Sequence, residues 1–193
     1  TCSRSSPSLA LTREAIAGLM ARAEEGMSAR DVYEKVLIPA EREVGRLWHA
    51  GKANVAEEHL VTTTTRRAMA ALSATVKPDE PNGKTVVIAA VAGNVHELGV
   101  RALADFFEFG GWRVIFLGAD MPREDLVHGT RFFDADIVIL SAALTTQLGE
   151  VELVINAIRE VGDEAPPVMV GGGAFADSAE LWRRVGADLT ART

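Results

Sequence analysis

The sequence predicts an α/β protein in two parts, an N-terminal four-helix bundle and a C-terminal doubly wound parallel sheet. Residues 9–76 are rich in Ala, Glu, Arg and Leu at helical spacing, whereas residues 84–193 alternate short β-branched runs with helical stretches. Strands that alternate with helices form right-handed βαβ units and therefore a parallel sheet. The segment between the two parts, 77–83, contains two prolines and a glycine, which is typical of a linker.

The boundaries of the bundle helices follow from capping residues and one proline. Ser28 is a good N-cap, and Asn54 with Glu57 three residues later forms a variant of the capping box. Pro39 suits the first turn of a helix and not its interior, so a new helix is expected to begin there. The predicted helices cover residues 12–24, 28–37, 39–49 and 54–76.

The second part predicts five strands and four helices. The third strand is the most apolar, so we expect it at the centre of the sheet with both faces covered. Five strands with this rhythm fit the flavodoxin-like, Rossmann-type fold, whose ligands bind beyond the carboxyl ends of the strands. The strands are predicted over residues 84–91, 112–118, 136–142, 166–172 and from 187, and the helices over 97–111, 122–134, 147–161 and 177–186.

Composition excludes several classes of function. Twenty Lys and Arg against 27 Asp and Glu give a net charge of −7, which argues against direct binding of nucleic acid. No apolar run approaches the ~20 residues of a membrane span, and the N-terminus does not read as a signal peptide. The single cysteine, Cys2, excludes an internal disulfide and fits a reducing, cytoplasmic setting. Because the chain begins without methionine, a further domain outside this sequence is one expectation.

Three loops that follow predicted strands carry candidate ligand-binding residues. His96 stands three residues before Gly99, Ser141 stands four before Thr145, and three glycines begin at Gly171. A lone loop histidine is most often solvated, and hydroxyl residues commonly cap helices, but a histidine at this edge can also ligate a metal. Three glycines would let another molecule approach the backbone, because a bare turn needs only one.

Together these residues resemble the cobalamin (B12)-binding domain of methionine synthase and corrinoid proteins. That family has Asp-x-His-x-x-Gly, then a serine about forty residues later and Gly-Gly about thirty beyond. Here Ser141 follows Gly99 by 42 positions and precedes Gly171 by 30, and residues 118–122 resemble the family's loop after the second strand. The resemblance implies a cobalamin whose displaced tail lies beside the sheet, with His96 as the lower cobalt ligand. The binding residues it implies here are Asn94, Val95, His96, Gly99, Ser141, Leu144, Thr145, Gly171 and Gly172.

Asn94 departs from the family pattern, because Asp is usual two residues before the histidine. An amide oxygen can accept a hydrogen bond from neutral imidazole but cannot share a proton with it. This departure argues against a histidine that leaves and rejoins cobalt with proton transfer, as in methyl transfer by methionine synthase. It does not argue against cobalamin binding.

A second group of residues is expected in the turn between the third and fourth helices. Trp48 and His49 end the third helix, and Glu58 and His59 lie one turn into the fourth. A core tryptophan and an exposed glutamate are the ordinary interpretations. However, Trp-x9-Glu-His resembles the signature of CarH-type adenosylcobalamin photoreceptors, whose bundle caps the upper face of the cofactor. The resemblance implies that Trp48, Glu58 and His59 hold the adenosyl group, and that His49 becomes the upper cobalt ligand after illumination.

The sequence therefore favours an adenosylcobalamin light sensor that is not an enzyme. Light would cleave the cobalt–carbon bond and change the conformation or oligomeric state, which would regulate a protein partner or transcription. Two alternatives are a corrinoid methyl carrier of a methyltransferase system and a B12 sensor that also binds a bilin, for which Cys2 is a poor attachment site. The expected partners are cobalamin, further copies of the chain and a protein partner or output domain, but neither nucleic acid nor a membrane.

Overall fold

The computed structural model describes residues 14–15, 17–18, 20–21, 25–160, 162, 164–176 and 180–191. The chain divides into two compact units, Thr1–Lys77 and Pro78–Thr193. Most of the helix predicted over 12–24, and also Cys2, lie outside the described residues. Within the described ranges, none of the helices combines the length and hydropathy that a membrane-spanning segment requires.

The second and third predicted helices form one continuous helical segment. It consists of α2 (Ala29–Val32), a π-helical stretch η1 (Tyr33–Leu37) and α3 (Ile38–His49), with helical backbone at both junctions. The predicted break before Pro39 is therefore wrong. The N–H of Ile38 donates to the carbonyl of Tyr33, five residues back, and this wider turn directly precedes Pro39. A π-helical turn relaxes the close spacing that normally makes proline clash inside a helix.

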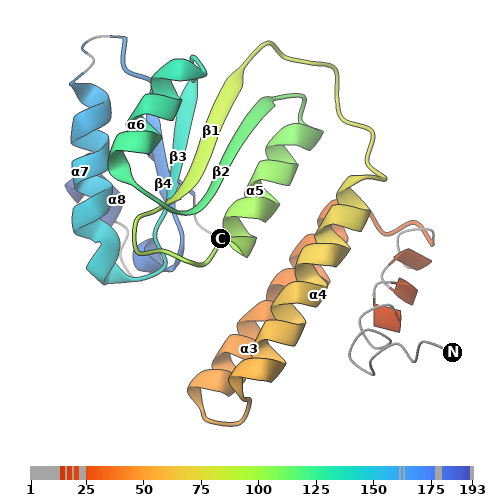
Figure 1. Ribbon diagram of the computed structural model, residues 1–193. Coiled ribbons are helices and arrows are strands. Elements are labelled where there is room, and N and C mark those ends of the chain that lie inside the picture. Colours follow the sequence, from red (N-terminus) through yellow and green to blue (C-terminus); the bar gives the residue numbers. More distant parts are fainter. Residues whose placement is uncertain are drawn as a thin grey trace, which may run out of the picture. The chain divides into compact units, whose positions relative to one another are not determined.

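The helix α4 (Val55–Ser73) packs beside α3 in a helical hairpin (Figure 1). The predicted capping box is confirmed, because Glu57 N–H donates to Asn54 Oδ1 at 3.0 Å and Asn54 N–H donates to the Glu57 carboxylate at 2.8 Å. Inside the unit, the buried Tyr33 hydroxyl donates to the carbonyl of Met69 at 3.0 Å. Buried apolar residues of this unit include Val32, Leu37, Val44, Ala68, Met69 and Leu72.

The second unit contains the predicted doubly wound sheet. Its five parallel strands have the order β2-β1-β3-β4-β5, so the flavodoxin-like topology and the central place of the third strand are confirmed. The strands are β1 (Thr85–Val91), β2 (Arg113–Met121), β3 (Ile137–Ser141), β4 (Val168–Gly171) and β5 (Leu189–Thr190).

Helices cover both faces of this sheet, α5 on one face and α6, α7 and α8 on the other (Figure 1). Every residue of β1 is buried. Since side chains alternate along a strand, every second residue from Val86 packs toward α5, and those between them, from Val87, pack toward the other helices. The helices are α5 (Leu98–Phe109), α6 (Arg123–Phe132), α7 (Leu148–Arg159) and α8 (Leu181–Arg184).

Strand β2 runs three residues beyond its predicted end, into the segment expected as a loop. The pairing with β1 shifts twice, because Ile88 pairs with Phe116, Ala89 with Gly118 and Val91 with Met121. Gly118 and Asp120 both have positive φ, +88° and +52°. These irregularities bend the strand end, which re-aims side chains toward the neighbouring loop.

The segment predicted as a linker is hydrogen-bonded to the turn between α5 and β2. Asp79 N–H donates to Phe109 O at 2.8 Å, and Asn82 N–H donates to Gly111 O at 3.0 Å. Gly111 has a φ of +75°, and a Cβ there would lie 2.3 Å from Glu80 O. Residues 79–82 are therefore held firmly within the second unit.

Candidate functional site

The parallel register brings three candidate loops to one edge of the sheet. Ala90 pairs with Ser141, and Ser141 pairs with Gly171, so the chain leaves β1, β3 and β4 at the same level. The loops that follow carry the residues predicted to bind a ligand. The expected arrangement at the carboxyl edge is thus present in the backbone.

Asn94 holds the loop that carries His96. The Asn94 side chain is fully buried, its Nδ2 donates to the carbonyl of Ser141 at 3.0 Å, and its Oδ1 accepts the main-chain N–H of His96 at 3.1 Å. Both partners are backbone groups. The position of Asn94 in the sequence suggested a partner of the His96 ring, whereas in the structure this amide holds the His96 main chain.

Two further polar side chains complete the support of this loop, and the sequence analysis did not identify either. Asp120 Oδ1 accepts the N–H of Gly93 at 2.7 Å, and Asp120 N–H donates to Asn94 O at 2.9 Å. Gln147 Nε2 donates to Gly93 O at 2.7 Å. The loops after β1, β2 and β3 are therefore joined by side-chain hydrogen bonds. No local pattern marks these residues, because their partners are distant in sequence.

The outer side of the same loops is exposed. The ring of His96 faces solvent, with Val95 70% exposed beside it in sequence and Leu144 56% exposed on the loop after β3. Val95 and Leu144 are thus among the large apolar side chains that the structure leaves exposed. At Gly99 an added Cβ would meet nothing within 4 Å, so no contact within the chain requires glycine there.

The three glycines at the end of β4 differ in whether the structure requires a residue without a Cβ. A Cβ at Gly172, whose φ is +99°, would lie 2.4 Å from Ala142 O, and one at Gly173 would lie 2.8 Å from Ala143 O. Both positions thus need glycine because the end of β4 passes close to the end of β3. The expectation that a bare turn needs only one glycine is therefore wrong. A Cβ at Gly171 would make only an ordinary 3.8 Å contact with Ala191 O.

The helical hairpin exposes the second group of candidate residues as two separate pairs. The Trp48 and His49 rings lie 6.2 Å apart, centroid to centroid, and Trp48 is 49% exposed. On α4, His59 Nε2 lies 3.5 Å from Glu58 Oε2. In the part of the chain that the structure describes, no ring contact or hydrogen bond joins one pair to the other.

Glu41 extends the second pair and was not identified from the sequence. The Thr62 hydroxyl lies 2.9 Å from Glu58 Oε1 and 3.2 Å from Glu41 Oε2, so two carboxylates from α3 and α4 converge on it. The other oxygen of Glu41 is buried and has no hydrogen-bond partner. Thr62 and Glu58 therefore have a polar environment within the hairpin, which explains part of the unusual threonine run.

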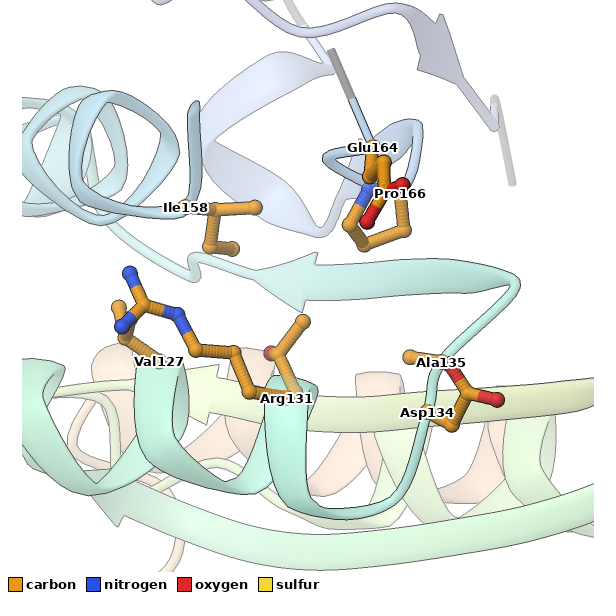
Figure 2. Close-up of a pocket in the computed structure, with 8 residues that line it drawn as sticks. Val127, Arg131, Asp134, Ala135, Ile158, Glu164 and Pro166 are labelled. Carbon is orange, nitrogen blue, oxygen red and sulfur yellow. The ribbon is translucent and has the colours of Figure 1, made fainter. Parts of the chain in front are cut away.

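A hollow of about 200 Å³ lies elsewhere, beside the amino ends of β3 and β4 (Figure 2). Arg131 and the carboxylates of Asp134 and Glu164 line it together with apolar side chains. It contains none of the predicted site residues. Its full lining is Val127, Thr130, Arg131, Asp134, Ala135, Ile158, Glu164 and Pro166.

His96 is the candidate metal-ligating residue at the carboxyl edge. Within the described residues, no three His, Cys, Asp or Glu side chains gather as a metal site would require. His96 alone offers one imidazole at the carboxyl edge. One imidazole is among the ligands that a protein can supply to a macrocycle-bound metal.

Comparison with known proteins agrees with this geometry. A family profile described as "B12 binding domain" matches residues 84–192, and a second profile of the same description matches 9–73. Dimethylamine corrinoid protein 1 of Methanosarcina acetivorans is 27% identical over 183 residues, covering 93% of this chain and 84% of that protein. The HTH-type transcriptional repressor CarH of Myxococcus xanthus is 32% identical over 154 residues, covering 79% of this chain but 50% of that protein.

Solved structures share the fold. The monomethylamine corrinoid protein of Methanosarcina barkeri has a TM-score of 0.81 and 20% identity, over 96% of this chain and 90% of that one. The methanol:cobalamin methyltransferase complex MtaBC, also from Methanosarcina barkeri, has a TM-score of 0.52 and 20% identity, over 94% of this chain and 69% of that one. The expected Rossmann-like fold with an N-terminal helical part is thus found in corrinoid proteins.

Proposed function

This chain belongs to the B12-binding domain family, and from that membership we propose that it is a corrinoid protein that carries a methyl group within a methyltransferase system. The similarity to a dimethylamine corrinoid protein spans 93% of the chain and so includes both units. The comparisons support this interpretation, which the sequence analysis held as an alternative, better than they support the light sensor.

The main support for corrinoid binding is the way in which the His96 loop is held. Its main chain is fixed by the buried amide of Asn94, while its imidazole remains exposed for a ligand. His96 would hold the cobalt of a corrinoid from below. Once bound, the corrinoid supplies a cobalt centre that takes up and releases a methyl group.

The neighbouring loops would bind the rest of the cofactor. Ser141, Thr145 and Gly171 would line its tail, and the exposed Val95 and Leu144 would cover apolar parts of it and exclude water. The Asn94 side chain binds the main-chain groups of Ser141 and His96, so in this proposal it orients His96 and moves no proton at the ring.

A methyltransferase is the proposed partner. The fold of this chain occurs in a methanol:cobalamin methyltransferase complex. In such a system this chain would bind and orient the corrinoid, and partner enzymes would bring the methyl donor and acceptor. The chain would thus be a subunit of an enzyme system and not a catalyst alone.

The hairpin favours a second candidate, the adenosylcobalamin light sensor. Trp48 with His49 and Glu58 with His59 match the photoreceptor-like signature, and the CarH repressor is 32% identical over 154 residues. In this candidate the hairpin binds the adenosyl group and light changes the oligomeric state. Binding of a bilin stays a prediction, and Cys2, the only cysteine of the sequence, lies outside the described residues.

One experiment separates the two candidates. The protein is mixed in the dark with methylcobalamin or adenosylcobalamin, and absorbance and size-exclusion profiles are recorded before and after green light. A methyl carrier should bind both forms with affinities within roughly ten-fold of each other and keep its size on illumination. A strong preference for adenosylcobalamin, together with a light-dependent change in size, would instead establish the sensor. Absence of cobalamin binding would contradict both.

Single substitutions assign the residues. In the His96→Ala variant we expect bound cobalamin to lose the absorbance features of imidazole coordination. His128→Ala is the matched control, because His128 is also an exposed histidine but lies within α6 and not on a loop at the carboxyl edge of the sheet. The sensor alone predicts that His49→Ala changes the spectrum after illumination and that Trp48→Ala weakens a preference for adenosylcobalamin.

A further inference from the structure

We propose that Gln147 is a positioning residue for His96. Its side chain joins the loop after β1 to the loop after β3. The inference deepens the proposed function and rests on it for the role of His96. Gln147 ends the 3-10 turn η2 (Thr145–Gln147) and is 7% exposed. An amide that stabilised only its own turn would make no hydrogen bond to another loop, whereas Gln147 bonds to Gly93 O.

The Gln147 side chain makes three hydrogen bonds to backbone groups. Its Oε1 accepts the N–H groups of Ala143 and Leu144, at 2.8 and 3.1 Å. Its Nε2 donates to the carbonyl of Gly93 at 2.7 Å. One side chain therefore holds the loop that presents Leu144 and the loop that presents His96.

Gly93 is the point at which the His96 loop would otherwise be most free to turn. Its φ of +79° lies in the region that glycine adopts most readily. Its N–H is held by Asp120 Oδ1, and its C=O is held by Gln147 Nε2. With both polar groups of Gly93 bound, the peptide planes on either side of it cannot rotate without breaking one of these hydrogen bonds. Three residues later the same loop carries the His96 ring.

The position requires an amide, because one end must accept and the other must donate. A glutamate at 147 could still accept from Ala143 and Leu144, but it would place a carboxylate oxygen against Gly93 O. A methionine of similar length would satisfy neither loop. Gln147→Glu therefore breaks only the link to the His96 loop, whereas Gln147→Met removes both links.

Amide hydrogen exchange of the cofactor-free protein tests the lock directly. In Gln147→Glu we expect exchange at the N–H groups of Gly93 and His96 to speed up by roughly ten-fold or more, while the core strand amides of Val87 and Ile139 keep their rates. Asn156→Asp is the matched control, because it makes the same amide-to-acid change on the exposed side of α7. Unchanged exchange at Gly93 and His96, or equal acceleration throughout the core, would overturn the proposal.

Gln147→Met provides a second, uncharged variant should the glutamate disturb folding. Here the Leu144 amide should also exchange faster, because its acceptor has been removed. If Leu144 accelerates and His96 does not, the side chain supports only its own turn and the inference is wrong.

Cobalamin binding supplies the functional measurement. Removal of groups that orient a metal-ligating histidine typically costs 10–100-fold in affinity, so we expect about ten-fold weaker cobalamin binding and a smaller imidazole-coordinated fraction in Gln147→Glu. Affinity and coordination equal to those of the parent would overturn the positioning role. If the parent protein itself binds no cobalamin through imidazole, the proposed function fails, and the exchange rates still decide whether Gln147 locks the loop.

Discussion

The two candidate surfaces of this chain are held in place in opposite ways. The His96 loop is fixed by the side chains of Asn94, Asp120 and Gln147, each of which makes a hydrogen bond between two loops. Asn94 and its partner Ser141, for example, are 47 residues apart in sequence. The helical hairpin presents Trp48 and His59 from exposed helix surface, and its turn is closed by the local capping box of Asn54 and Glu57.

Hydrogen bonds between distant residues therefore hold the His96 loop in one geometry, whereas exposed residues of the hairpin can be replaced at little loss of stability. Substitutions in the His96 loop should affect folding and cofactor binding together. Substitutions of exposed hairpin residues should affect only what binds there.

The largest expected effect is at the crowded glycine of the carboxyl edge. Gly172→Ala places a Cβ 2.4 Å from Ala142 O at a φ of +99°, so we expect a loss of about 3 kcal/mol in the free energy of unfolding. Gly149→Ala is the control, because a Cβ there meets nothing within 4 Å and alanine favours the helix. Urea denaturation measures both. A loss below about 1 kcal/mol for Gly172→Ala would show that this edge is less rigid than inferred.

The next prediction compares the two surfaces directly. Asn94→Ala leaves Ser141 O and His96 N–H without their partner, and should lower the free energy of unfolding by about 2 kcal/mol. His59→Ala, at a hairpin side chain that is 73% exposed, should change it by no more than about 0.5 kcal/mol. Thermal and urea unfolding of both variants would check this. Equal losses would remove the distinction between the surfaces.

A smaller effect on stability is expected at the capping box of the hairpin. Asn54→Ala removes the side-chain half of the capping box and should cost about 1 kcal/mol, because the N–H of Glu57 at the start of α4 loses its acceptor. Lys52→Ala, at an exposed position in the same turn, is the control. Comparable stability of the two variants in urea titrations would contradict the prediction.

The smallest effect concerns an exposed ion pair at the opposite edge of the sheet. The Lys84 ammonium, 2.6 Å away, and the N–H of Thr85 lower the pKa of Asp136 below its ordinary value. Since the folded pKa lies below the unfolded one, the pair stabilises the fold above the ordinary aspartate pKa of about 3.9, and this contribution is lost as the pH falls through and below that value.

Asp136→Asn should therefore flatten the fall in the free energy of unfolding between about pH 5 and pH 2. Lys84→Gln should flatten the same part of the curve, and the two changes together should add little beyond either alone. Urea titrations across this pH range measure the slopes. A slope that neither substitution alters would show that this pair does not contribute to acid sensitivity.

Local patterns in the sequence determined most of the architecture. The alternation of β-branched runs with helices specified the parallel sheet, the apolar third strand specified its centre, and Asn54 with Glu57 specified the start of α4. These features could be predicted because each depends on residues within a few positions of one another. The spacing of His96, Ser141 and Gly171 likewise indicated the B12-binding family.

The tertiary structure decided how the site is held. The π-helical turn before Pro39, the bent end of β2 at Asp120 and the close passage of Gly172 past Ala142 each depend on backbone geometry that residue types do not encode locally. The link from Gln147 to Gly93 joins positions 54 residues apart. Such hydrogen bonds form only after the sheet has brought its loops to one edge, which is why the sequence predicted candidate ligand-binding residues but not the side chains that fix their loops.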